Sequence, residues 1–310
     1  MKKLFKTPVV IFIFNRPDLT RVLFEKIAQL KPLHLYIVSD GPRDDIYGEV
    51  GLVEECRRIF RKINWDCQVS CNYSNVNLGC KKRISSGVSW VFSHEKTAIF
   101  LEDDCYPDDT FFSYCEELLE KYMNNPKINI INGANHIGNM SSNFEADYYL
   151  SKYAHIWGWA SWSHKWVKNY DVDMREWPRY RKIELLKSIF KSNSEVRFWT
   201  NYFDQVYEKK IDTWDFQVSY MNFTKGLLAI APAKNLISNI GFNRDDATHT
   251  KSNSSYAGLR TYAASVPLRH PSVLEEHAIY DAEESKQYRY HAFQVFIRRL
   301  YYKLKRKITK

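Results

Sequence analysis

The stretch Ala98-Ile99-Phe100-Leu101-Glu102-Asp103-Asp104 joins a short apolar run directly to three carboxylates. The apolar part has the composition of a strand that is covered on both faces, as strands of parallel sheets are. Adjacent carboxylates repel one another unless a cation neutralises them. Mg²⁺ and Mn²⁺ take one or two protein carboxylates and leave positions for phosphate oxygens. A solvated acidic turn is the commoner fate of such a triplet, so its place in the fold decides between the two interpretations.

Strands and helices alternate through roughly the first hundred residues. The predicted elements are strand 9–14, helix 19–30 with Asp18 as its cap, strand 34–38, helix 49–63, strand 67–72, helix 81–92 and strand 98–101. This order predicts an α/β fold with a doubly wound, mostly parallel sheet. Beyond Asp104 we expect a helix over 109–122 and a strand over 128–131, then a mixed, aromatic and loop-rich region to about Pro271.

Polar residues follow each of the four predicted strands. In sheets of this kind, ligands bind outside the carboxyl ends of the strands. The residues at these ends are Asn15-Arg16, Asp40-Gly41, Asn77-Leu78-Gly79 and Glu102-Asp103-Asp104. We therefore expect them to converge on one crevice, which favours the metal-site interpretation of the acidic triplet.

The net charge of +9 is unevenly distributed. Residues 298–310 carry most of the excess and include no acidic residue, and 288–310 are predicted to form a basic amphipathic helix. A nucleic-acid-binding protein would spread its basic surface over the folded body, so we expect no nucleic-acid partner. The tail fits either a membrane surface or a solvated helical extension.

The six cysteines form no C-x-x-C pair and no cluster with zinc spacing. Scattered thiols in a chain of this length fit a reducing cytoplasm. The apolar run after the N-terminal lysines is too short to span a membrane. We therefore expect a cytoplasmic protein, and the basic tail leaves open a peripheral position at the inner face of the cell membrane.

Several short motifs occur in a fixed order over residues 8 to 250. Together they resemble GT-A-fold glycosyltransferases, in particular the inverting N-acetylglucosaminyltransferase I group and its bacterial relatives. The motifs are Asn15-Arg16-Pro17, Val38-Ser39-Asp40, Asn77-Leu78-Gly79, Leu101-Glu102-Asp103-Asp104, Pro107-Asp108-Asp109-Thr110-Phe111-Phe112, His155-Ile156-Trp157-Gly158-Trp159, Asp212-Thr213-Trp214-Asp215, Asn239-Ile240-Gly241-Phe242 and Ala247-Thr248-His249.

This resemblance implies a GT-A fold with a nucleotide-sugar-binding half over 1–132, an acceptor-binding and catalytic half over 133–270, and a basic extension over 271–310. It implies transfer of a sugar, with inversion, from a UDP-sugar donor to a glycan acceptor, with Mn²⁺ or Mg²⁺ as cofactor. An acceptor carried on a lipid would make use of the basic tail. The corresponding role is assembly of a bacterial surface polysaccharide or lipopolysaccharide, which is an expectation from family analogy.

The resemblance also implies roles at the strand ends. Arg16 and Asp40 match residues at the uracil end of a uridine nucleotide, and Asn15 belongs to the same nucleotide-binding set. Asp103 matches the acid that faces the ribose and donor sugar, and Asp104 matches the direct metal ligand. Without the family match, Arg16 is equally well explained as a surface arginine and Asp40 as a turn residue.

The loop before the predicted helix 81–92 is a candidate for the diphosphate. Gly79 would let the backbone approach the phosphates, Lys81 would supply positive charge, and Asn77 lies beside them. No P-loop pattern is present, so Gly79 is also explained as a helix-start turn.

An inverting transferase needs a general base near the acceptor hydroxyl. Asp215 is the first candidate because Trp214-Asp215 resembles the catalytic aspartate of the acceptor-side loop, and Asp212 and Asp246 are its rivals. The alternative for Asp215 is a helix cap or an ion pair. His249 is a candidate second metal ligand, since a neutral imidazole suits Mn²⁺.

Trp157 and Trp159 are expected either to stack on the acceptor sugar or to pack in the core. Other activities stay open at this point. A sugar nucleotidyltransferase would need a glycine-rich loop with Arg and Lys after the first strand, which Asn15-Arg16-Pro17 does not provide. A non-catalytic glycan- or nucleotide-binding protein with a GT-A-like fold, and a membrane-surface scaffold, are the remaining alternatives.

Overall fold

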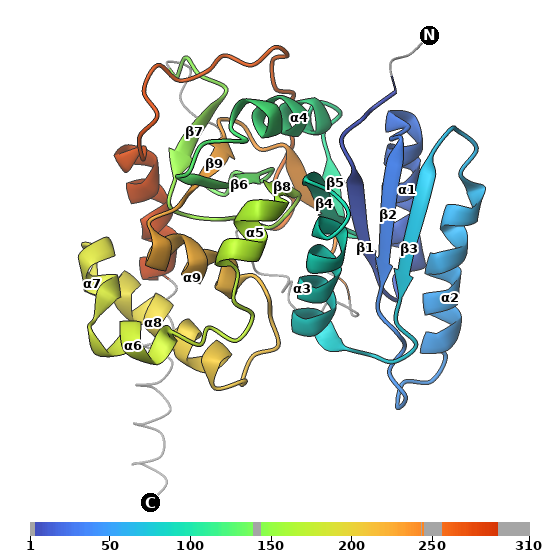
Figure 1. Ribbon diagram of the computed structural model, residues 1–310, viewed down its shortest axis with the longest axis horizontal. Coiled ribbons are helices and arrows are strands. Elements are labelled where there is room, and N and C mark those ends of the chain that lie inside the picture. The colour runs from blue at the N-terminus through green and yellow to red at the C-terminus, as the bar shows by residue number, and fades with distance from the viewer. Residues whose placement is uncertain (1–3, 139–143, 243, 245–255, 291–310) are drawn as a thin grey trace, which may run out of the picture.

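The computed structural model describes residues 4–138, 144–242, 244 and 256–290. It shows an α/β protein with helices on both faces of an eight-stranded sheet (Figure 1). Strands β7 and β8 run against the other strands. The strand order is β3 (Gln68–Tyr73), β2 (His34–Ser39), β1 (Val9–Ile13), β4 (Thr97–Glu102), β8 (Trp159–Trp162), β6 (Ile128–Asn132), β9 (Leu228–Pro232) and β7 (Tyr148–Ser151). The predicted fold class, α/β with a mostly parallel sheet, is confirmed.

The N-terminal half follows the predicted alternation. β1 lies between β2 and β4 and pairs with both in parallel, and β2 pairs in parallel with β3. The connecting helices are α1 (Pro17–Leu30), α2 (Glu49–Ile59), which continues into the 3-10 turn η1 (Phe60–Lys62), and α3 (Gly79–Phe92). Pro17 begins α1 because the first turn of a helix does not need its N–H. Asp18 therefore lies in the first turn and not at the cap, which corrects the prediction.

Both faces of the sheet are covered. Alternate residues of β1 enter different cores: Val9 and Ile11 enter one, and Val10 and Phe12 the other. Helices α1, α2 and α4 (Phe111–Lys121) pack on the first face. Helices α3, α5 (Ser163–Asn169) and α9 (Phe216–Lys225) pack on the second. The continuous apolar strands are therefore buried as the sequence predicts.

A second, two-stranded sheet lies beside the end of β4. It pairs β5 (Cys105–Pro107) with β10 (Ile237–Asn239) in antiparallel register, with Asn239 opposite Cys105. Because β5 directly follows Asp104, this pairing brings residues 240–242 next to the acidic triplet. Residues more than a hundred positions apart in the sequence thus meet at the carboxyl end of the parallel strands.

The aromatic-rich region forms a third core in the C-terminal half. It packs α6 (Trp177–Lys182), α7 (Leu185–Ile189) and α8 (Asn193–Tyr207) against α9. Ring contacts within it include Trp177 with Phe203 at 5.2 Å and Trp199 with Phe223 at 4.9 Å between centroids. Most aromatics of this region therefore serve packing rather than ligand stacking.

Residues 278–290 form a helix that packs onto this half (Figure 1). The Oγ of Ser151 donates a hydrogen bond of 2.6 Å to buried Asp281, Ser285 donates one to Glu195, and the ring of Tyr288 lies 4.9 Å from that of Trp199. The helix starts before the predicted 288–310 segment, most of which (291–310) lies outside the described residues. None of the described helices is both long and apolar enough to span a membrane.

Lys165 holds the connection between α4 and β6. Its side chain is 6% exposed, and its Nζ donates hydrogen bonds to the backbone oxygens of Tyr122 (3.2 Å), Asn125 (2.9 Å) and Ile128. The same ammonium lies 3.7 Å from the ring centroid of Trp162. Burial lowers the pKa of Lys165 from 10.5 to about 8.

We expect Lys165→Met to lower the free energy of unfolding by about 2–4 kcal/mol, because buried carbonyls lose a charged donor. Urea unfolding at pH 7 measures this, with exposed Lys168→Met on the same helix as the control. Between a native pKa of about 8 and an unfolded value of 10.5, the unfolded chain binds more protons. Wild-type stability should therefore rise with pH in this window, and the variant should lack that rise. Equal loss in both variants would contradict the assigned role.

Candidate functional site

The acidic triplet lies at the carboxyl end of β4, as predicted. Asp103 and Asp104 are buried, at 2% and 9% exposed, and Glu102 is the last residue of the strand. The backbone N–H of Ile240 donates a 2.8 Å hydrogen bond to the backbone oxygen of Asp104. The triplet is therefore not a solvated turn but part of the interior at the sheet edge.

Arg16 pairs with both aspartates. Its Nε and Nη2 donate to the two carboxylate oxygens of Asp103, the former at 3.2 Å, and its Nη1 donates to Asp104 Oδ2 at 3.0 Å. Arg16 occupies the cap position of α1, directly after β1. The ends of β1 and β4 thus contribute to one cluster, which is the convergence that the sequence predicts.

Negative charge remains in excess at this cluster. Burial raises the pKa of Asp103, against the opposing attraction of Arg16, and Asp104 raises it further. Burial also raises the pKa of Glu102 well above its usual value, and Asp104 adds to that rise. Three carboxylates therefore face one guanidinium, an imbalance that a further cation would relieve.

The residues at this edge fit a divalent cation that shares its coordination with a substrate. Among the described residues, no group of three or more His, Cys, Asp and Glu side chains is arranged to hold a metal ion alone. Mg²⁺ in phosphate-binding sites takes only one or two protein carboxylates. Asp104 would supply one as a hard oxygen donor, whereas both oxygens of Asp103 are paired with Arg16. The other predicted ligand, His249, lies outside the described residues.

Asp40 anchors the loop that precedes α3. It is 7% exposed and accepts hydrogen bonds from the backbone N–H groups of Gly41 (2.9 Å), Leu78 (2.9 Å) and Gly79 (3.1 Å), and from Asn77 Nδ2 (3.2 Å). Asp40, Asn77 and Gly79 are therefore brought together as expected. These three residues contact one another. The Asp40 carboxylate accepts the N–H groups of the loop that an anion would otherwise bind.

The start of α3 is also met by Asp212. The backbone N–H of Lys81 donates to Asp212 Oδ1 at 3.3 Å, and a Cβ added at Gly79, whose φ is +77°, would lie 2.6 Å from Asp212 Oδ2. The Nζ of Lys81 lies 3.4 Å from Asp173. Gly79 is thus required both for its backbone conformation and for the close approach of Asp212. The groups predicted to cradle phosphate bind protein carboxylates in this structure.

Asn15 points toward α2. Its Nδ2 donates a 2.8 Å hydrogen bond to Glu49 Oε1, and Glu49, at 1% exposed, also accepts the backbone N–H of Arg43 at 2.6 Å. Asn15 therefore holds the loop after β2 to the end of β1, one residue from the Arg16 cluster.

Asp215 occupies the N-cap position of α9, but its side chain makes no capping hydrogen bond, and its Oδ1 accepts a hydrogen bond from Thr213 Oγ1. Burial raises the pKa of the nearby Cys80 thiol, and the charges of Glu102, Asp215, Asp212 and Asp40 raise it further. Sequence reasoning assigned no role to this thiol. Asp246, the other rival base, lies outside the described residues.

The two tryptophans of the Trp157-Gly158-Trp159 motif have different surroundings. Trp159 is 2% exposed and stacks on Phe100 at 4.2 Å between ring centroids, so it is a core residue and not an acceptor platform. Trp157 is half-buried and contacts Phe242 at 5.6 Å and Tyr256 at 6.0 Å.

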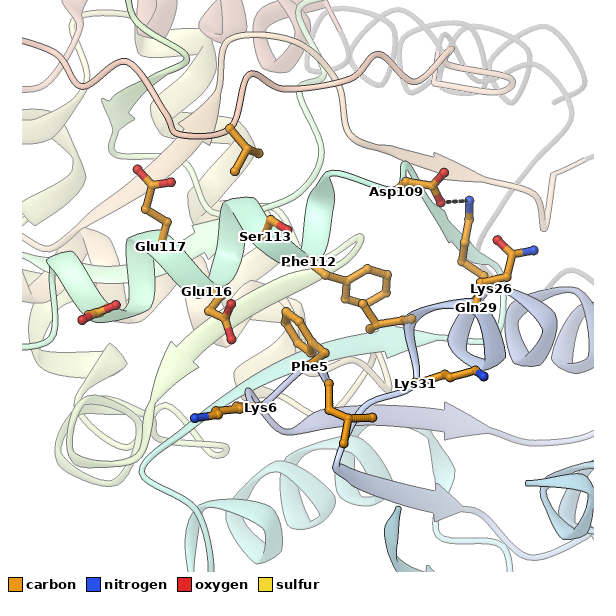
Figure 2. Close-up of a pocket in the computed structure, with 14 residues that line it drawn as sticks. Phe5, Lys6, Lys26, Gln29, Lys31, Asp109, Phe112, Ser113, Glu116 and Glu117 are labelled. Carbon is orange, nitrogen blue, oxygen red and sulfur yellow. Dashed lines mark hydrogen bonds and ion pairs between the residues drawn. The ribbon is translucent and has the colours of Figure 1, made fainter. Parts of the chain in front are cut away.

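A separate groove of about 820 Å³ runs between α1 and α4 (Figure 2). Phe5 and Phe112 meet edge to face in it at 5.9 Å, and the Lys26–Asp109 ion pair of 2.6 Å crosses one end. None of the predicted site residues lines it. The carboxylate cluster at the strand ends, rather than this groove, holds the predicted chemistry.

No protein-family model and no curated protein matches the chain. Among solved structures, UDP-glucose pyrophosphorylase complexed with UDP-glucose is similar at 10% identity and a TM-score of 0.38, over 76% of this chain and 93% of that one. Apo mouse xyloside xylosyltransferase 1 is similar at 10% identity and a TM-score of 0.35, over 71% and 82%. Mannose-1-phosphate geranyltransferase from Thermus thermophilus is similar at 12% identity and a TM-score of 0.37, over 74% of each chain. These scores are too low to place the chain in any of these proteins' families.

We expect Asp40→Asn to lower the free energy of unfolding by about 1–3 kcal/mol, because the amide sets a donor against N–H groups that need an acceptor. Chemical unfolding of the purified protein measures the change. Asp44→Asn, at an exposed position in the same loop, is the matched control and should leave stability unchanged. An unaltered Asp40→Asn protein would show that Asp40 does not anchor the loop.

Proposed function

We propose that this chain is a glycosyltransferase that moves a sugar from a UDP-sugar donor to a glycan acceptor with Mn²⁺ or Mg²⁺ as cofactor. One observation carries the proposal: Arg16, Asp103 and Asp104 form a buried, negatively charged cluster at the carboxyl ends of the central strands. This is where open α/β sheets bind their ligands. A divalent ion shared with a diphosphate would neutralise the negative charge that remains there.

In the proposal, Asp104 is the metal ligand and Asp103 faces the ribose and donor sugar. Arg16 and Asp40 define the uracil end, Arg16 directly and Asp40 by holding the loop 77–79. His249 is the proposed additional metal ligand. A bound divalent cation supplies positive charge that stabilises the departing diphosphate.

Asp215 is the proposed general base. In the proposal it lies on the acceptor side, and its charge, with those of Glu102 and Asp212, adds to the rise in the Cys80 pKa that burial causes. Thr213 donates to Oδ1 of Asp215, which fixes the carboxylate and leaves Oδ2 to accept the proton of the acceptor hydroxyl. A base opposite the leaving group corresponds to attack with inversion.

The proposed acceptor is a glycan, free or lipid-linked, in the assembly of a bacterial surface polysaccharide or lipopolysaccharide. The basic tail would hold the protein at the inner face of the membrane through anionic headgroups. The packed helix 278–290 connects that tail to the acceptor half of the fold.

UDP should raise the melting temperature of the protein in the presence of Mn²⁺ but not with Mn²⁺ replaced by a chelator. At a UDP concentration of about 100 Kd the expected stabilisation is about 2.7 kcal/mol. Asp104→Ala should fold and lose this effect, because the ion then lacks its protein ligand. A wild-type protein that neither UDP nor UDP with Mn²⁺ stabilises would refute the donor site.

Asp215→Asn should keep UDP–Mn²⁺ binding and lower kcat by about 10²- to 10⁴-fold, the usual contribution of a general base. A donor-hydrolysis screen over UDP-sugars first identifies the substrate, and the variants are then compared by transfer. Asp66→Asn, at an exposed carboxylate before β3, is the control. Normal transfer by Asp215→Asn eliminates Asp215 as the base. If the wild-type protein binds nucleotide but turns over no UDP-sugar, the result supports a non-catalytic binding protein.

A further inference from the structure

The turn that follows β10 is built against Asp104. Buried Asn239 accepts the backbone N–H of Gly241 on its Oδ1 at 2.9 Å, which closes the turn. The N–H of Ile240 donates to the backbone oxygen of Asp104 at 2.8 Å. The Ile240 contact continues the antiparallel pairing of β10 with β5, whereas the Asn239 contact is local to the turn.

Gly241 has no room for a side chain. A Cβ at this position would lie 2.6 Å from Asp104 Oδ2, 2.9 Å from Asp104 Cβ and 3.2 Å from Arg16 Nη1. Non-bonded carbon atoms prefer about 3.5–4.0 Å. Gly241 is not among the glycines with positive φ, so the requirement at this position is space and not backbone conformation.

The backbone at Gly241 is also held from its other side. Phe242 packs edge to face on Trp157 at 5.6 Å, and Trp157 in turn contacts His136 at 4.7 Å. The β10–β5 pairing fixes the residues before the turn. A larger residue at 241 therefore pushes on the side chains of Asp104 and Arg16, which are the parts of the contact that can move.

We propose that Gly241 is a positioning residue for Asp104: its missing side chain leaves the space in which the Asp104 carboxylate stands. This inference rests on the proposed function, in which Asp104 holds the metal. Gly241 touches no reacting atom in this role and acts through the carboxylate that it borders.

The test is Gly241→Ala, alone and combined with Asp104→Gly, which removes both carboxylate-side atoms that the new methyl would meet. In the wild-type background the melting temperature should fall, by about 1.5 °C for each kcal/mol lost in a protein of this size. In the Asp104→Gly background the same substitution should cost much less. An equal fall in both backgrounds overturns the inference, because the strain would then lie elsewhere.

Nucleotide binding gives the second measurement. By calorimetry with Mn²⁺ present, Gly241→Ala should weaken UDP binding by about 10- to 100-fold, as for other changes that misorient a metal ligand. Affinity equal to that of the wild type overturns the inference. Gly51→Ala, in α2 with nothing within 4 Å of the added Cβ, is the matched control. It should leave UDP affinity unchanged and should raise the melting temperature slightly, because alanine is favoured over glycine in a helix.

The two hypotheses fail differently. Wild-type protein that binds no UDP with Mn²⁺ refutes the proposed function and with it the metal-related part of this inference. The thermal comparison still decides in that case whether Gly241 positions Asp104, since it needs no ligand.

Discussion

Repulsion among the three carboxylates at the end of β4 is the constraint around which this edge of the molecule is built. Arg16 offsets part of it by pairing with Asp103 and Asp104 from the start of α1. That pairing requires β1 and β4 to be neighbours, and Gly241 must approach as bare backbone because the guanidinium and carboxylate fill the remaining space. The charge that stays uncompensated gives the cluster its capacity for a further cation, so the arrangement that keeps the acids buried also makes them chemically useful.

Two other carboxylates have a different task. Asp40 and Asp212 accept backbone N–H groups at the beginning of α3, where the helix dipole favours negative charge. Asp40 fixes the loop 77–79, and Asp212 ties the loop before α9 to the start of α3. Acidic residues that look equivalent in sequence thus divide into two groups. The anchors accept backbone N–H groups, whereas the two aspartates of the β4 cluster meet the side chains of Arg16 and Cys105.

Local sequence patterns were sufficient to predict the N-terminal half of the fold, in which β1 to β4 run in parallel. Strands such as 98–101 are continuously apolar because both faces are covered, and the polar strand ends then had to converge. The contact of Gly241 with Asp104 was not predictable, since it depends on the pairing of β10 with β5 across a long sequence separation. Trp159 and Trp157 are two residues apart in the sequence. Only the packing of Trp159 against Phe100 distinguishes it, as a core residue, from the partly buried Trp157. The start of the helix at residue 278 was not predictable from the apolar pattern, because the buried face of the helix carries the acidic residues Asp281 and Glu284.

The packing of the helix 278–290 has a consequence for the order in which the chain is completed during synthesis. The four parallel strands and their helices are contiguous in sequence and can assemble as soon as that segment is available. The C-terminal half is completed later, because Ser151 and Glu195 each form one of their hydrogen bonds with a residue of the helix 278–290. Before residues 278–290 are synthesised, a nascent chain would therefore carry a folded N-terminal half and an incompletely folded, aromatic-rich C-terminal half. The chain would be most prone to aggregation during this period.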